Sequence, residues 1–98
     1  MYSMSDLLQL LKTERADELK LHVGSSPVLV VAGEQHSIEG PVITPENAEE
    51  LLHSIAETRH RRELRARGVV QFVHRFQRST DFVVRAKIED QGVGLDIH

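Results

Sequence analysis

The sequence predicts an α+β fold, in which a mostly antiparallel sheet has two to three helices packed on one face. Three observations lead to this class: a leucine-rich helical pattern opens the chain, two short strand patterns follow it, and the last third alternates polar and apolar residues. The chain has 98 residues, of which 40% are hydrophobic, and no repeat or low-complexity tract. We therefore expect a single domain over residues 1–98.

The first element is predicted to be a helix over residues 3–15, with Ser3 or Ser5 as its N-cap. Its apolar side chains recur at helical spacing on one face, which Leu10 widens; they are Met4, Leu7, Leu8 and Leu11. A leucine face of this kind is typical of a helix that covers a core, and a partner-docking helix is the alternative.

A pair of strands should follow. Residues 18–23 alternate apolar and polar side chains, which predicts a strand with one buried face. Residues 24–27 supply turn residues, and the nearly continuous apolar run at 28–32 predicts a strand covered on both sides. Residues 34–43 are expected to form a short strand or an extended connection.

A second helix should begin at Thr44, because the threonine can cap free amides and Pro45 suits the first helical position. Its apolar residues follow at helical spacing; they are Ala48, Leu51, Leu52, Ile55 and Ala56. Residues 59–67 are predicted to be either a third helix or a continuation of the second, closed by Gly68.

The last third predicts two or three antiparallel strands, with turns at residues 79–81 and 90–92. The apolar faces of these strands carry Val70, Phe72, Phe76, Phe82, Val84, Ala86, Ile88, Val93, Leu95 and Ile97. His74 shares the face of the phenylalanines and should be partly buried and hydrogen-bonded, whereas His22 and His36 should be exposed.

Residues 16–34, ADELKLHVGSSPVLVVAGE, resemble a signature of the N-terminal domain of hexameric pilus and secretion motor ATPases, the PilT, GspE and PilB family. That signature reads A-S-D-L-H-L-x-x-G-x-x-P-x-x-R-x-D-G. The positions that match are those that make the fold: Ala16, Leu19, Leu21, Gly24, Pro27, Val31 and Gly33. The resemblance implies a PAS-like sheet with helices on one face.

The polar positions of the signature differ. The family reads R-F-R-V-N-x-[FY] in its late strands, and its arginines reach toward the nucleotide of a neighbouring subunit, but Asp81 and Val83 stand at those positions here. A phosphate contact needs a cationic donor, so the implied role facing ATP is weakened. The family's phosphate-binding pattern, G-x-x-x-x-G-K-[ST], does not occur in these 98 residues.

Charge is distributed unevenly along the chain. Residues 59–78 contain seven arginines and one acid, a balance of +6, while the remaining residues carry −9. This asymmetry can steer an acidic protein partner or a second copy of the chain, and a solvated helix face is the alternative. The predicted partner-binding residues are Arg59, Arg61, Arg62, Arg65 and Arg67. Nucleic acid is disfavoured by the net charge of −3 and by an aromatic content of 4%.

No catalytic, cofactor-binding or metal-binding site is predicted. The chain has no cysteine, its six histidines form no H-x-H or H-x-x-x-H pair, and its serines have no recognisable histidine and aspartate partners. No signal peptide or membrane-spanning pattern is present, so we expect a cytoplasmic protein without membrane insertion.

These observations favour a non-catalytic protein-interaction module related to pilus or secretion motor ATPases, either as a stand-alone protein or as a domain of a longer ATPase. Its partner would be a P-loop motor ATPase. Two alternatives stay open: a small-ligand sensor with a pocket in its PAS-like core, and a homo-oligomeric scaffold held by opposite charges.

Overall fold

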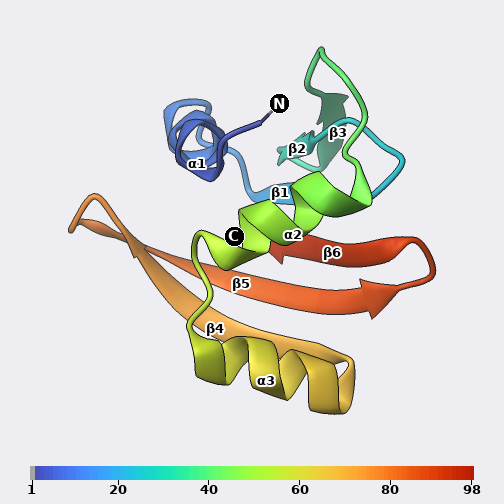
Figure 1. The fold of residues 1–98 in the computed structure, drawn as a ribbon. Coiled ribbons are helices and arrows are strands. Elements are labelled where there is room, and N and C mark those ends of the chain that lie inside the picture. The colour runs from blue at the N-terminus through green and yellow to red at the C-terminus, as the bar shows by residue number, and fades with distance from the viewer. Residues whose placement is uncertain (1) are drawn as a thin grey trace.

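The computed structural model describes residues 2–98, which form a six-stranded antiparallel sheet and three helices (Figure 1). The elements in chain order are α1 (Met4–Thr13), β1 (Glu18–Leu21), β2 (Val28–Val31), β3 (Glu34–Ser37), α2 (Pro45–His53), α3 (Thr58–Arg67), β4 (Val69–Phe76), β5 (Thr80–Glu89) and β6 (Gly92–Ile97). The strands lie in the order β3-β2-β1-β6-β5-β4. The predicted α+β class is confirmed.

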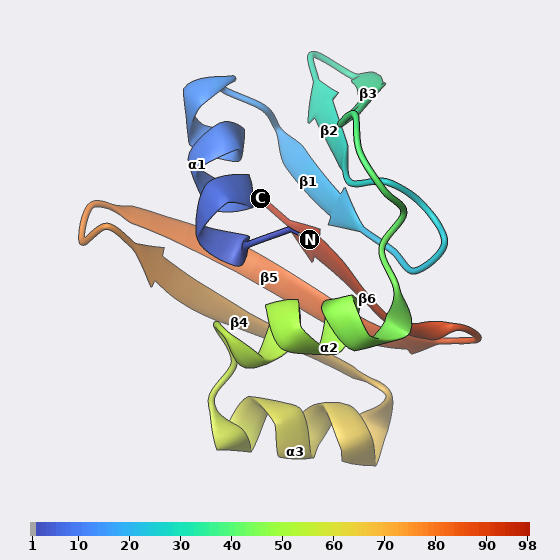
Figure 2. The same ribbon diagram turned by 45° about the horizontal axis from the view of Figure 1, so that its top comes forward.

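The core lies between the helices and one face of the sheet (Figure 2). The central strands supply its most buried side chains, and Leu19, Leu21, Val84, Leu95 and Ile97 are all 0% exposed. The leucine face of α1 covers this surface as predicted, with Met4, Leu7, Leu8 and Leu11 buried. The three phenylalanines also face the core as predicted, because Phe72, Phe76 and Phe82 are each less than a tenth exposed.

The predicted helix starts are confirmed. Ser3 caps α1, since its Oγ accepts a hydrogen bond from the backbone N–H of Asp6 at 3.2 Å. Thr44 caps α2 in the same way, and its Oγ1 accepts from the N–H of Asn47 at 3.1 Å. Residues 54–57 separate α2 from α3, so residues 59–67 belong to a third helix and do not continue the second. Gly68 ends that helix with a left-handed φ of 81°, which glycine adopts readily.

Two predictions about the strands were wrong. The apolar run at residues 28–32 is not covered on both sides, because only Leu29 of β2 is buried and its other three residues are half-buried. This strand lies next to the edge strand β3, and the helices cover only one face there. The first late turn spans residues 77–79 rather than 79–81, with φ of 55° at Gln77 and 63° at Arg78, and β5 already begins at Thr80.

The pairing of β1 with β6 is short, with three paired positions from Leu19 to Leu21. His22, which follows β1, strengthens this connection by contacting β5 and β6 on the face opposite the helices. Its Nδ1 lies 2.8 Å from Oε1 of Glu89 on β5, and its Nε2 lies 2.9 Å from Oδ1 of Asp96 on β6. The prediction that His22 is exposed was therefore wrong, since it is half-buried and spans three strands.

No helix formed by residues 2–98 is long and apolar enough to cross a membrane.

Candidate interaction site

Helix α3 is held on the sheet by His60. The imidazole stacks on Phe72 of β4, with ring centroids 4.2 Å apart and planes inclined by 7°. Its Nδ1 accepts a hydrogen bond from the backbone N–H of Glu57 at 3.1 Å, which satisfies a free donor at the start of the helix. Leu64, one turn further on, is the buried apolar residue of α3. These contacts leave the remaining sides of the helix to solvent.

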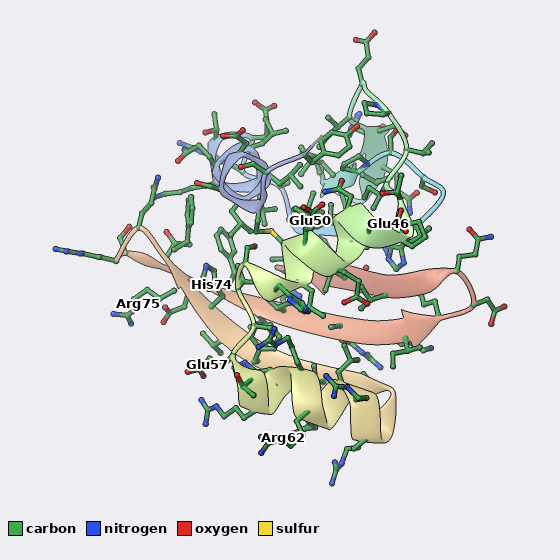
Figure 3. The ribbon with its side chains drawn as sticks, in the orientation of Figure 1. Glu46, Glu50, Glu57, Arg62, His74 and Arg75 are labelled. Atoms are coloured by element: carbon green, nitrogen blue, oxygen red, sulfur yellow. The ribbon has the colours of Figure 1, made fainter. Side chains whose placement is uncertain are left out.

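The five predicted partner-binding arginines all lie on α3, and Figure 3 labels Arg62 among them. Arg59, Arg62, Arg65 and Arg67 are exposed, and Arg61 is half-buried. Arg59 is paired with Glu57 through Nη2 and Oε2 at 3.0 Å. Within residues 2–98, Arg62, Arg65 and Arg67 form no ion pair, so their charge is available to a partner. Arg65 and Arg67 also lie in the last helical turn, where a cation stabilises the helix.

The structure divides the arginine-rich stretch of residues 59–78 between α3 and β4. Arg75 lies on β4, far from Arg62 in Figure 3. Its guanidinium binds Asp81 through Nε at 2.9 Å and Nη2 at 3.3 Å. That bond lowers the pKa of Asp81 and raises the pKa of Arg75. The concentrated basic surface therefore consists of the arginines of α3. Asp81, at a position where the family signature has arginine, is bound to Arg75 of the same chain.

Arg61 differs from Arg62, Arg65 and Arg67 because its guanidinium is bound to other side chains. Its Nη1 donates to Nδ1 of His53 on α2 at 3.0 Å, and its Nη2 donates to Oγ1 of Thr58 at 3.3 Å. A guanidinium has no acceptor, so Nδ1 of His53 must be unprotonated in this contact. The contact joins α2 to α3 and holds one arginine in a fixed position.

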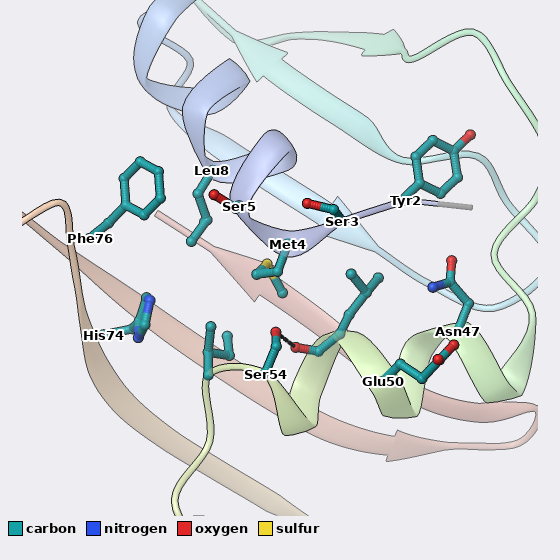
Figure 4. A pocket seen from close by; sticks show the side chains of 12 residues that line it. Tyr2, Ser3, Met4, Ser5, Leu8, Asn47, Glu50, Ser54, His74 and Phe76 are labelled. Atoms are coloured by element: carbon teal, nitrogen blue, oxygen red, sulfur yellow. Dashed lines mark hydrogen bonds between the residues drawn. The ribbon is translucent and has the colours of Figure 1, made fainter.

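A second candidate site is a cavity of about 470 Å³ between α1, α2 and the end of β4 (Figure 4). Leu8, Phe76 and Met4 supply apolar walls, while Asn47 and Glu50 supply polar groups. Asn47 is only 4% exposed, which is unusual for a polar side chain. The sequence left a pocket in a PAS-like core open as an alternative but did not indicate this position, because Asn47 carries no signal beyond its place in the first turn of a capped helix.

His74 borders the same cavity and is half-buried as predicted. Burial lowers the pKa of His74, because the charged imidazolium loses hydration there. The predicted hydrogen bond of His74 is not found within residues 2–98, so that part of the prediction was wrong. Over the same residues, no three histidine, aspartate or glutamate side chains form a group that could hold a metal ion.

Comparison with known proteins finds similar folds among solved structures. No protein-family model matches the chain, and no curated protein matches it. Among solved structures, the pilus retraction motor PilT with bound ADP matches all of this chain with a TM-score of 0.90 at 19% identity. The Legionella pneumophila ATPase DotB matches 97% of it with a TM-score of 0.80 at 14% identity, and the Yersinia pseudotuberculosis ATPase DotB matches 100% of it with a TM-score of 0.72 at 12% identity.

The chain spans 29%, 27% and 31% of the lengths of these three proteins, respectively. At such low identity the likeness establishes the fold. The matched region is the N-terminal part of those ATPases, outside their ATPase part. The recognition based on residues 16–34 is confirmed at this level: the chain has the fold of the N-terminal domain of PilT and DotB ATPases.

Proposed function

We propose that this chain is a non-catalytic interaction module that binds a P-loop motor ATPase of a pilus or secretion machine. The observation that carries the proposal is the match over the full chain, at a TM-score of 0.90, to the part of PilT that precedes its ATPase region. The 98 residues contain no phosphate-binding loop of their own. Any effect on ATP hydrolysis would therefore act through contact with an ATPase.

The arginines of α3 are the proposed contact surface. Arginines concentrated on one helix attract acidic surfaces and speed encounter with them. Three of those on α3, Arg62, Arg65 and Arg67, form no ion pair within residues 2–98. Arginine also suits a protein interface, because its planar guanidinium binds carboxylates through two parallel hydrogen bonds. The surface Arg59, Arg61, Arg62, Arg65 and Arg67 is hence the proposed partner-binding site.

The test is a binding measurement with a purified PilT-type ATPase from the same source organism, immobilised for biolayer interferometry. The triple variant Arg61→Glu, Arg62→Glu, Arg65→Glu should bind at least tenfold more weakly than the wild-type chain. A charge-matched control, Lys12→Glu, Arg85→Glu, Lys87→Glu, changes three exposed cations elsewhere and should bind like the wild type. Equal binding by all three proteins would contradict the proposed surface.

A small-ligand sensor is the second candidate function, and the cavity of about 470 Å³ beside Asn47 and Glu50 favours it. This volume lies within the range of roughly 300–1,000 Å³ that is typical of small-molecule sites. A thermal-shift screen of metabolites would test the idea, with Asn47→Leu as the variant that should lose any response. No stabilisation by any metabolite, at concentrations up to millimolar, would count against it.

A further inference from the structure

Ile88 lies on the face of the sheet that the helices cover, but its own side chain is exposed. Ile88 of β5 follows Phe82, Val84 and Ala86 in the alternation that points into the core, and those three are 6%, 0% and 0% exposed. Ile88 itself is 51% exposed. The helices therefore leave an opening over the end of β5, where the apolar face of the sheet continues without a neighbour.

This opening is the mouth of a groove between α2, α3, the end of β5 and the start of β6, with a volume of about 230 Å³. Its interior is apolar, since it is lined by Leu52 of α2, Leu64 of α3 and Val93 of β6, which are 2%, 6% and 3% exposed. The volume falls below the range of roughly 300–1,000 Å³ that drug-sized ligands occupy. The groove is of a size to take one bulky apolar side chain.

Arginines flank this apolar interior. Arg61 and Arg65 both line the groove from α3. His53, at 3.0 Å, and Thr58, at 3.3 Å, hold the Arg61 guanidinium in place. Arg61 therefore loses less side-chain entropy when it binds an anion. Arg65 is exposed and forms no ion pair within residues 2–98. The groove thus combines an apolar interior with cations at its border.

Glu49 of α2 is the acid that lines the groove. Its Oε2 lies 3.7 Å from Nε2 of His53, and its side chain is 59% exposed. This carboxylate would repel an acidic ligand, although the two arginines outweigh it. Removing the charge of Glu49 should therefore strengthen the binding of an acidic ligand. A variant that was merely misfolded would bind more weakly, so the two effects can be told apart.

We infer that this groove, formed by Leu52, Arg61, Leu64, Arg65, Ile88 and Val93, binds an acidic segment of a partner protein. The segment inserts one leucine or phenylalanine side chain beside Ile88, and its neighbouring carboxylates pair with Arg61 and Arg65. The inference rests on the proposed function, in that it specifies how the basic helix recognises its partner. The apolar anchor supplies most of the affinity, and the charged pairs select acidic sequences.

The experiment uses the full chain and a fluorescein-labelled decapeptide with a single phenylalanine among aspartates and glutamates, followed by fluorescence anisotropy. Two control peptides replace the phenylalanine with serine or the acids with glutamine, and each should bind at least tenfold more weakly. On the protein side, Ile88→Asp should weaken binding at least tenfold, whereas Ile88→Leu should leave it within about twofold. Glu49→Gln should strengthen binding about twofold to fivefold. Circular dichroism should confirm that every variant is folded.

The results separate this inference from the proposed function. If Ile88→Asp binds the motor ATPase and the peptide as the wild type does, while the triple arginine variant loses the ATPase, the groove is refuted and the proposed function stands. If the peptide depends on Ile88 but the ATPase does not bind at all, the groove stands and its assignment to a motor ATPase fails. If the wild-type chain forms dimers in sedimentation that Ile88→Asp abolishes, a second copy occupies the groove and the acidic-partner inference is overturned.

Discussion

Replacing His22 with glutamine should destabilise the fold below pH 6.5 and should do so much less at pH 8.5. The reason lies in the two contacts of the imidazole, to Glu89 at 2.8 Å and to Asp96 at 2.9 Å, which join β1 to β5 and β6. Partial burial by itself would lower the pKa of His22. The hydrogen bonds and charges of Glu89 and Asp96 outweigh it, and the net pKa is raised above 6.5.

The sign of the pH dependence follows from that shift. A histidine whose pKa is higher in the folded state binds its proton more tightly there, so the proton stabilises the fold. This stabilisation is complete below the unfolded pKa of 6.5 and disappears as the pH rises through the folded pKa. The window for the loss therefore opens at about pH 6.5 and extends upward.

The magnitude must be discounted for solvent. The side chains of His22, Glu89 and Asp96 are 32%, 36% and 33% exposed. Ion pairs that solvent reaches contribute about 0.2–1 kcal/mol each, so the two contacts together should contribute about 1 kcal/mol. For a domain of this size, that corresponds to a melting temperature lower by about 4–8 °C.

The assay is thermal unfolding of the wild type and His22→Gln, measured by circular dichroism at half-unit intervals from pH 5.5 to 8.5. The difference in melting temperature should be largest at the acid end and should shrink toward pH 8.5. Titrating groups that do not contact His22 are common to both proteins, so their effects cancel in the difference. A difference that is constant over this range, or that grows with pH, would refute the reasoning.

Three further predictions use the same measurement. Gly94→Ala should lower the free energy of unfolding by about 1 kcal/mol and abolish the same pH dependence. The reason is that a Cβ at residue 94 would lie 2.6 Å from Nδ1 of His22 and would also overlap Oε1 of Glu89. A variant that keeps the wild-type pH profile would show that the contacts tolerate the methyl group. His74→Phe should gain stability relative to the wild type as the pH falls below 6.5, since the lowered pKa of His74 makes its protonation oppose folding; an advantage that shrinks toward acid pH would contradict this sign. Thr44→Ala should lose about 1 kcal/mol at every pH, because α2 loses its N-cap bond, and an unchanged melting temperature would show that the cap contributes nothing.

Much of the fold could be predicted because its elements carry local signals. The alternation of Leu19 and Leu21, the leucine face of α1, the Thr44 cap and Gly68 at a left-handed position each reflect a rule that acts over a few residues. The signature at residues 16–34 also works locally, since it encodes one hairpin of the sheet. These features were sufficient for the class and for the resemblance.

The features that escaped prediction depend on distant residues. His22 is bound by side chains 67 and 74 positions away, and nothing near it in sequence indicates a partner. The continuous apolar run of β2 cannot reveal that only one face is covered, because coverage is decided by where the helices pack. Ile88 obeys the alternation of its strand but lies beyond the cover of α2 and α3. The turn at Gln77 and Arg78 lacks the glycine or asparagine that usually indicates positive φ.

The candidate site was predicted only in outline. The sequence identified the arginines of residues 59–67 as a basic segment, but it could not show which of them are free. The structure shows that Arg59 is paired with Glu57 and that Arg61 is bound to His53, and the latter contact depends on how α2 and α3 pack. The groove beside Arg61 arises from four elements that meet only in the folded chain.

The most direct test of the central claim is the affinity of the chain for a purified PilT-type motor ATPase. We expect saturable binding that falls at least tenfold in the triple variant Arg61→Glu, Arg62→Glu, Arg65→Glu and is retained in the control Lys12→Glu, Arg85→Glu, Lys87→Glu. Binding that is absent in the wild type, or equal in all three proteins, would contradict it.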